Sequence, residues 1–142
     1  MVQLTQTVTF AASHQLPRHD GKCARLHGHS WRAAVVVEGP DLQQSGPKSG
    51  MLADYADIGR PLKALVESHL DHWHLNETTG IENPTSEELA RWMFWKLRPF
   101  IPALAAVVVE ETCTSRCEFR PLRDPIFGQV LDMTITRTGG DK

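Results

Sequence analysis

A period-two alternation of apolar and polar residues in the first forty positions is the feature that most constrains the fold. In residues 2–14 the even positions are apolar until His14, with Gln6 as the one polar interruption. Residues 27–37 continue the alternation at odd positions, beginning with two histidines, and Gly39-Pro40 follows. Alternate side chains of a β-strand share one face. Both segments are therefore predicted to be strands with one apolar face, and the histidines lie on that face.

Helical periodicity follows a polar loop at residues 41–50. Apolar positions between Ile58 and Leu70 recur at helical spacing. Because proline is tolerated only in a first helical turn, Pro61 leaves two possibilities. The helix begins near Gly59, or it begins at Asp54 and is kinked.

A second helix is marked more clearly. Thr85 and Glu88 have the spacing of a capping box, and Pro99 ends the apolar pattern that follows. The valine-rich residues 104–112 and the alternating residues 129–138 then predict two further strands.

The order strand, strand, helix, helix, strand, strand predicts an α+β fold. We expect an antiparallel four-stranded sheet with both helices on one face. A length of 142 residues, of which 41% are hydrophobic, is typical of one domain, here residues 1–142. Two prolines and mixed charges at 121–127 indicate an irregular connection, so a C-terminal extension is expected from about residue 121.

The charge distribution argues for a small-molecule partner. The net charge is -2, and the basic residues are scattered, so neither nucleic acid nor an acidic membrane surface is an expected partner. The N-terminus lacks a basic segment followed by an apolar run, and no stretch has the length of a membrane span, which predicts a cytoplasmic protein. The three cysteines are too few for a disulfide framework.

Three histidines form a candidate metal site. His27 and His29 are two residues apart on one predicted strand and project from the same face, and His14 comes from the neighbouring strand. A lone histidine on an apolar face is more often structural, so the paired spacing carries the argument. A catalytic Zn²⁺ is commonly held by three protein ligands with one position left open. We therefore predict a Zn²⁺ site.

Several strings resemble the motifs of the 6-pyruvoyl-tetrahydropterin synthase superfamily, in the family's order. The longest are Phe10-Ala11-Ala12-Ser13-His14 and Cys23-Ala24-Arg25-Leu26-His27-Gly28-His29-Ser30-Trp31. The others are Gly50-Met51-Leu52-Ala53-Asp54-Tyr55, Leu70-Asp71-His72-Trp73-His74-Leu75-Asn76, Asn83-Pro84-Thr85-Ser86-Glu87 and Glu111-Thr112-Cys113-Thr114 with Cys117. The resemblance implies the tunnelling fold, in which subunits join their sheets into an oligomeric barrel with active sites at the interfaces. A homo-oligomer, hexamer or tetramer, is expected.

Within the superfamily, the sequence resembles the bacterial 6-carboxy-tetrahydropterin synthases of the queuosine pathway, because a cysteine stands four residues before His27. The resemblance implies conversion of 7,8-dihydroneopterin triphosphate to 6-carboxy-5,6,7,8-tetrahydropterin, with release of acetaldehyde and triphosphate. It also implies that Cys23 is the base, that His72 with Asp71 relays the proton, and that Glu111 binds the pterin. Near a metal a thiol pKa falls towards neutrality, which suits Cys23 to this role.

Two alternatives remain open. The pyruvoyl synthase reaction shares metal, fold and substrate, and a non-catalytic zinc- or pterin-binding module would keep the three histidines without needing Cys23, Asp71 and His72 together. The sequence departs from the family pattern at Gly59-Arg60-Pro61, at Arg116 and in residues 121–142.

Overall fold

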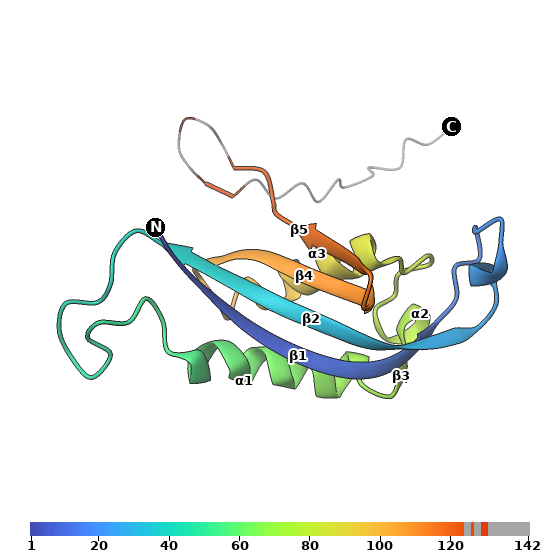
Figure 1. Cartoon of the computed structure of the whole chain (residues 1–142), viewed down its shortest axis with the longest axis horizontal. Coiled ribbons are helices and arrows are strands. Elements are labelled where there is room, and N and C mark those ends of the chain that lie inside the picture. The colour runs from blue at the N-terminus through green and yellow to red at the C-terminus, as the bar shows by residue number, and fades with distance from the viewer. Residues whose placement is uncertain (124–125, 127–128, 131–142) are drawn as a thin grey trace, which may run out of the picture.

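The computed structural model describes residues 1–123, 126, 129 and 130, and its centre is a long curved pair of strands (Figure 1). Strand β1 (Val2–His14) pairs antiparallel with β2 (His27–Gly39) along their whole length, from Val2 opposite Gly39 to His14 opposite His27. Both strands were predicted, and the register places the three histidines at one end of the pair.

The sheet has five strands, in the order β3-β1-β2-β4-β5. Strand β4 (Leu104–Thr112) pairs antiparallel with β2, and β5 (Ser115–Phe119) pairs antiparallel with β4. Strand β3 (Trp73–His74) pairs parallel with β1 at Ala12 and Ser13. The prediction of a four-stranded antiparallel sheet was therefore wrong in strand number and in direction.

Physical reasons account for both missed strands. Strand β3 has two residues, too few to show an alternation, and it is defined by the chain passing beside β1. Strand β5 has five residues, and only Cys117 and Phe119 of its core-facing side pack against the hydrophobic core, so its alternation is too short to stand out in the sequence. The strand expected at residues 129–138 lies outside the described residues except at 129 and 130, where Val130 forms an isolated bridge to Arg123.

Helix α1 (Tyr55–Leu65) begins directly after Asp54, which was the second of the two predicted starts. The Asp54 side chain accepts a hydrogen bond from the backbone N–H of Ala56 at 2.9 Å, which caps the first turn. Pro61 lies inside the helix, beyond the first turn. It removes one backbone N–H from the helix, and it is partly exposed. A π-helical turn, Val66–Leu70, continues the segment.

Helix α3 (Ser86–Leu97) begins at the predicted N-cap, Thr85, but only one of the two capping-box bonds forms, because the Glu88 carboxylate bonds to Arg91. The Thr85 hydroxyl accepts a hydrogen bond from the backbone N–H of Glu88 at 3.2 Å. Two short helical segments were not predicted, a 3-10 turn at Lys22–Ala24 and α2 at Leu75–Thr78. Both are too short to show a helical period.

The hydrophobic core lies between one face of the sheet and helices α1 and α3. It unites Phe10 and Trp31 from the central strands with Leu62 from α1 and Phe94 from α3, all of them buried. Both helices thus cover the same face, as predicted. A smaller cluster of Val36, Ala106 and Val108 is buried on the other face. No helix among the described residues has the length and apolarity to cross a membrane.

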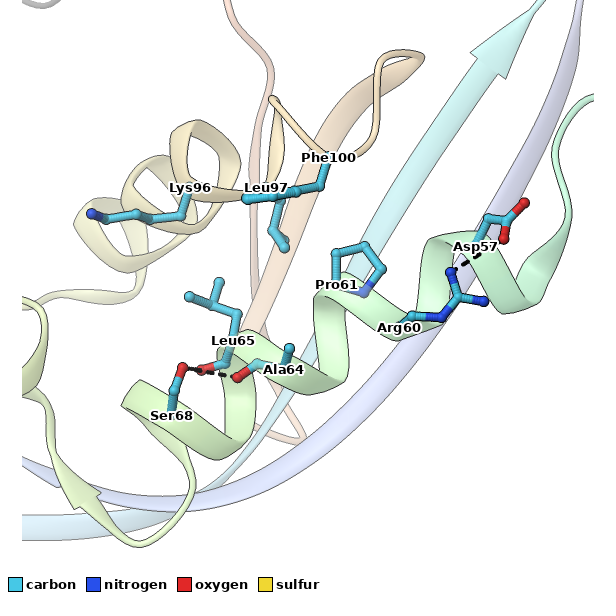
Figure 2. Close-up of a pocket in the computed structure, with 9 residues that line it drawn as sticks. All are labelled: Asp57, Arg60, Pro61, Ala64, Leu65, Ser68, Lys96, Leu97 and Phe100. Carbon is cyan, nitrogen blue, oxygen red and sulfur yellow. Dashed lines mark hydrogen bonds and ion pairs between the residues drawn. The ribbon is translucent and has the colours of Figure 1, made fainter.

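A groove of about 640 Å³ lies between α1 and the end of α3 (Figure 2). Its apolar wall is formed by Leu65, Leu97 and Phe100, and Arg60 and Lys96 lie at its rim. None of the predicted site residues lines it.

Candidate active site

His14, His27 and His29 converge at the end of the β1–β2 pair. The ring centroids of His14 lie 4.5 Å from His27 and 5.2 Å from His29, and those of His27 and His29 are 4.9 Å apart. His27 lies directly opposite His14 in the strand register. The three imidazoles predicted from spacing therefore meet at one point.

Backbone carbonyls fix which nitrogen of two of these rings carries the proton. Nδ1 of His14 lies 2.9 Å from the carbonyl oxygen of Pro84, and Nδ1 of His27 lies 2.7 Å from that of Arg25. A carbonyl only accepts hydrogen bonds, so each Nδ1 is the donor when the ring is neutral. The Nε2 of each ring is then left with its lone pair, and this is the form that binds a metal.

The three Nε2 atoms are buried, and none has a hydrogen-bond partner in the described chain. An unsatisfied buried nitrogen is costly, and three of them together require a shared partner. Burial also lowers the pKa of His14 below its ordinary value, which keeps this ring neutral and able to bind a metal. The donor set therefore fits a divalent metal ion that prefers imidazole.

Glu111, at the end of β4, is the fourth member of this cluster. One carboxylate oxygen, Oε1, lies 3.0 Å from Nε2 of His14 and 2.9 Å from Nε2 of His29. One ligand atom from each of the four residues lies within 4.8 Å of the ligand atoms of the other three. The sequence interpretation assigned Glu111 to the substrate only, and its approach to the histidines was not predicted.

Trp31 supports the histidines from the core side. Its ring packs edge-on against His14 at 5.0 Å and His29 at 5.3 Å, and its Nε1 donates to the carbonyl of Ala12 at 3.1 Å. The side chain is fully buried. The histidine end of the strands therefore rests on a packed aromatic ring.

Asp71 and His72 lie at the neighbouring sheet edge. Oδ2 of Asp71 is 3.0 Å from Nδ1 of His72, and Oδ1 accepts a hydrogen bond from the backbone N–H of Ala11 at 3.0 Å. That backbone bond and then His72 hold the pKa of Asp71 below its ordinary value. His72 has a positive φ of 62°, and its side chain is 82% exposed. A shallow hollow of about 500 Å³ is bordered by both His72 and His29.

Cys23 lies in the 3-10 turn before β2 and is half-buried. Its carbonyl accepts a hydrogen bond from the backbone N–H of Leu16, which ties the loop to the residues after His14. The described ligand cluster does not include its thiol. The structure therefore brings His14, His27, His29 and Glu111 together and leaves Cys23 in the adjoining loop.

The comparison with known families agrees with this arrangement. Residues 3–122 match the family model described as 6-pyruvoyl tetrahydropterin synthase. The chain belongs to this family. The match covers both central strands, both long helices and the β4–β5 hairpin.

Relatives of the family span nearly the same length. The 6-carboxy-5,6,7,8-tetrahydropterin synthase of Synechocystis sp. is 47% identical over 121 residues, which cover 84% of this chain and 94% of that protein. The Haemophilus influenzae enzyme of the same name is 29% identical and covers 84% and 99%. The structure of Caenorhabditis elegans 6-pyruvoyl tetrahydropterin synthase has a TM-score of 0.73 at 26% identity and covers 85% and 96%.

Asn76 is a positioning residue that the sequence interpretation did not identify. Its side-chain oxygen accepts from the backbone N–H of Gln15, and its amide donates to the carbonyls of Gln15 and Glu82 at 2.8 and 3.1 Å. These bonds join the residue after His14 to the loop that carries Pro84. The signal was present, because Asn76 closes a motif quoted for the family, but only the fold shows what it holds.

Proposed function

We propose that this family member is a Zn²⁺-dependent 6-carboxytetrahydropterin synthase, a carbon-carbon lyase. It would convert 7,8-dihydroneopterin triphosphate to 6-carboxy-5,6,7,8-tetrahydropterin with release of acetaldehyde and triphosphate. The observation that carries the proposal is the convergence of three buried, unsatisfied Nε2 atoms on one point in a chain 47% identical to a protein of that name. A cytoplasmic location is part of the proposal.

His14, His27 and His29 would hold the Zn²⁺ through Nε2. When bound, the ion supplies a Lewis acid for oxygens of the substrate side chain, where negative charge develops as a weakly acidic C–H is deprotonated. The carbonyls of Pro84 and Arg25 keep the first two rings in the required tautomer.

Cys23 is the proposed base, and His72 is the proposed proton relay. Asp71 is anchored on the backbone of Ala11 and orients His72 through Nδ1, which leaves Nε2 of His72 to exchange protons. The high exposure of His72 supports a site that is completed by another subunit, because a proton relay works best where water is excluded.

Glu111 would bind the pterin. The amino-pyrimidine edge of a pterin presents parallel N–H donors, which a carboxylate accepts in bidentate fashion. The Glu111 side chain is 29% exposed, so a ligand can reach it. Glu110 points to the opposite face, where it lies 3.5 Å from Arg32.

A homo-oligomer, hexamer or tetramer, is part of the same proposal. Among the described residues, β3 covers only Ala12 and Ser13 of the outer edge of β1, and β5 forms the other edge of the sheet. Long open edges pair readily with strands of another chain. Light scattering at micromolar concentration should give a closed oligomer, and a stable monomer would contradict the shared site.

Mass spectrometry of the products tests the reaction itself. Purified protein should convert 7,8-dihydroneopterin triphosphate to the carboxy product, and a strong chelator should abolish turnover. A pyruvoyl product would favour the activity named for the Caenorhabditis elegans neighbour. Pterin binding without any turnover would favour the alternative that the protein is a non-catalytic binding module.

Replacing Cys23 separates catalysis from binding. Cys23→Ala should lose turnover by about 10²-fold or more, as expected for a positioned proton-transfer group, while metal content and pterin affinity stay unchanged. Turnover at the wild-type rate would show that this thiol is an inert cysteine and would move the role of base to His72.

A further inference from the structure

The Glu111 carboxylate points into the histidine cluster. Its Oε1 lies within hydrogen-bonding distance of both His14 and His29, although neither contact has hydrogen-bond geometry. A residue whose only task was to accept N–H groups from a substrate would have no need to approach two imidazole nitrogens. This position therefore requires an explanation of its own.

The protonation state of His14 narrows the explanation. Because Nδ1 of His14 donates to Pro84, its Nε2 has a lone pair, and it faces a carboxylate oxygen at 3.0 Å. Two electron-pair donors at that distance repel each other unless a cation lies between them. His27, whose Nδ1 donates to Arg25, presents a lone pair to the same point.

The two distances from Glu111 Oε1 are close to those in a four-coordinate site. With metal–ligand bonds of about 2.0–2.1 Å, neighbouring ligand atoms of a tetrahedron lie about 3.3 Å apart. The two contacts of Glu111 Oε1, 3.0 and 2.9 Å, are slightly shorter than this value. Small adjustments of the partly exposed Glu111 side chain would open them to the full tetrahedral distance.

We propose that Glu111 is the fourth ligand of the resting metal site, and that a bound pterin draws its carboxylate away from the metal. The proposal rests on the proposed function, because it assumes that the metal and the pterin use the same site. Glu111 would then have two alternative partners, the metal in the free protein and the pterin N–H groups in the complex. Its departure opens the fourth position only when a pterin is present.

The coupling has a thermodynamic consequence. If metal and pterin compete for one carboxylate, each weakens the interaction of the other with Glu111 by the same factor. A pterin that lacks side-chain hydroxyls should therefore change the metal environment, even though it has no hydroxyl with which to bind the metal. Removal of the Glu111 charge should abolish this effect.

The first arm measures metal affinity in the full chain by competition with a chromophoric chelator. Glu111→Gln should weaken Zn²⁺ binding by about tenfold or more, with circular dichroism unchanged. Glu110→Gln is the matched control, because it removes the same charge from the adjacent residue on the opposite face and should leave the affinity unchanged. Equal or tighter Zn²⁺ binding by Glu111→Gln would overturn the proposal.

The second arm uses the visible absorption of Co²⁺-substituted protein, which reports the ligands of the ion. The wild-type spectrum should differ from that of Glu111→Gln, and 6-methylpterin should alter the wild-type spectrum but not that of the variant. Identical spectra for wild type and Glu111→Gln would overturn the proposal, as would a wild-type spectrum unaffected by saturating 6-methylpterin.

Failure of this inference would be distinguishable from failure of the proposed function. If Glu111 binds only the pterin, Glu111→Gln loses pterin affinity at unchanged metal affinity, and the wild-type protein still forms the carboxy product. If the proposed function fails, the wild-type protein forms no carboxy product, whatever the Co²⁺ spectra show.

Discussion

The histidine cluster and the groove between α1 and α3 differ both in size and in the chemistry of their side chains. The groove is the larger hollow, yet its wall is mostly apolar and its cations already have partners: Arg60 lies 3.4 Å from Asp57, and Lys96 lies over the ring of Trp92. The cluster at the end of β1 and β2 is lined by polar side chains, and three of its buried nitrogens lack hydrogen-bond partners in the described chain.

The difference teaches that the volume of a hollow and its chemistry have separate origins. The groove lies where two helices cover one sheet, and Figure 2 shows its side chains along α1 and at the end of α3. The cluster follows from strand register, which places His14 opposite His27 and next to His29. Unsatisfied polar atoms, and not empty space, identify the candidate site here.

The largest expected effect tests the cluster side of this comparison. Purified protein should carry about one Zn²⁺ per chain, and His27→Ala or His29→Ala should remove it while the fold survives, because each variant loses one of the three imidazole ligands. Elemental analysis and circular dichroism check both points. His19→Ala is the control, since His19 lies in the exposed loop and accepts a hydrogen bond from Gly21. Full metal retention by both variants would contradict the assignment of these histidines as metal ligands.

A smaller effect is expected at Asn76, which supports the cluster without touching it. Asn76→Ala removes three hydrogen bonds to the backbone and should lower the free energy of unfolding by about 1–3 kcal/mol. Metal affinity should fall by about tenfold, because Gln15 and the Pro84 loop lose their connection. Urea unfolding and chelator competition measure the two effects. Unchanged metal affinity in a destabilised variant would limit Asn76 to the fold.

Asp71 gives a pH-dependent effect at the sheet edge. Its pKa is lowered from 3.8 in the folded protein, so its contribution to stability is present above pH 3.8 and is lost as the pH falls through the lower folded value. Asp71→Asn should therefore be less stable than wild type at pH 7, and the difference should shrink below pH 4. Urea midpoints between pH 7 and 3 test this, and a difference independent of pH would contradict it.

The smallest effect is expected in the groove. Phe100 is 70% exposed, so Phe100→Ala should change the free energy of unfolding by no more than about 0.5 kcal/mol and should leave metal content and turnover unchanged. Chemical unfolding and steady-state kinetics provide the measurements. A loss of turnover in this variant would mean that the groove takes part in the reaction, and the contrast between the two regions would fail.

The sequence by itself determined the two central strands, the capped helix α3, the valine-rich strand β4 and the face on which the helices pack. These features depend on local periodicity and on capping chemistry, which neighbouring residues encode directly. The three histidines were also identified at this level. Two of them are spaced along one strand, and the third shares the apolar face of the next.

Tertiary structure alone decided the rest. Strand β3 exists because the chain passes beside Ala12 and Ser13, and α1 runs through Pro61, which the sequence pattern had left open. The approach of Glu111 to the histidines joins residues almost a hundred positions apart. No local pattern encodes such a distance, because it results from the register of β2 against both β1 and β4.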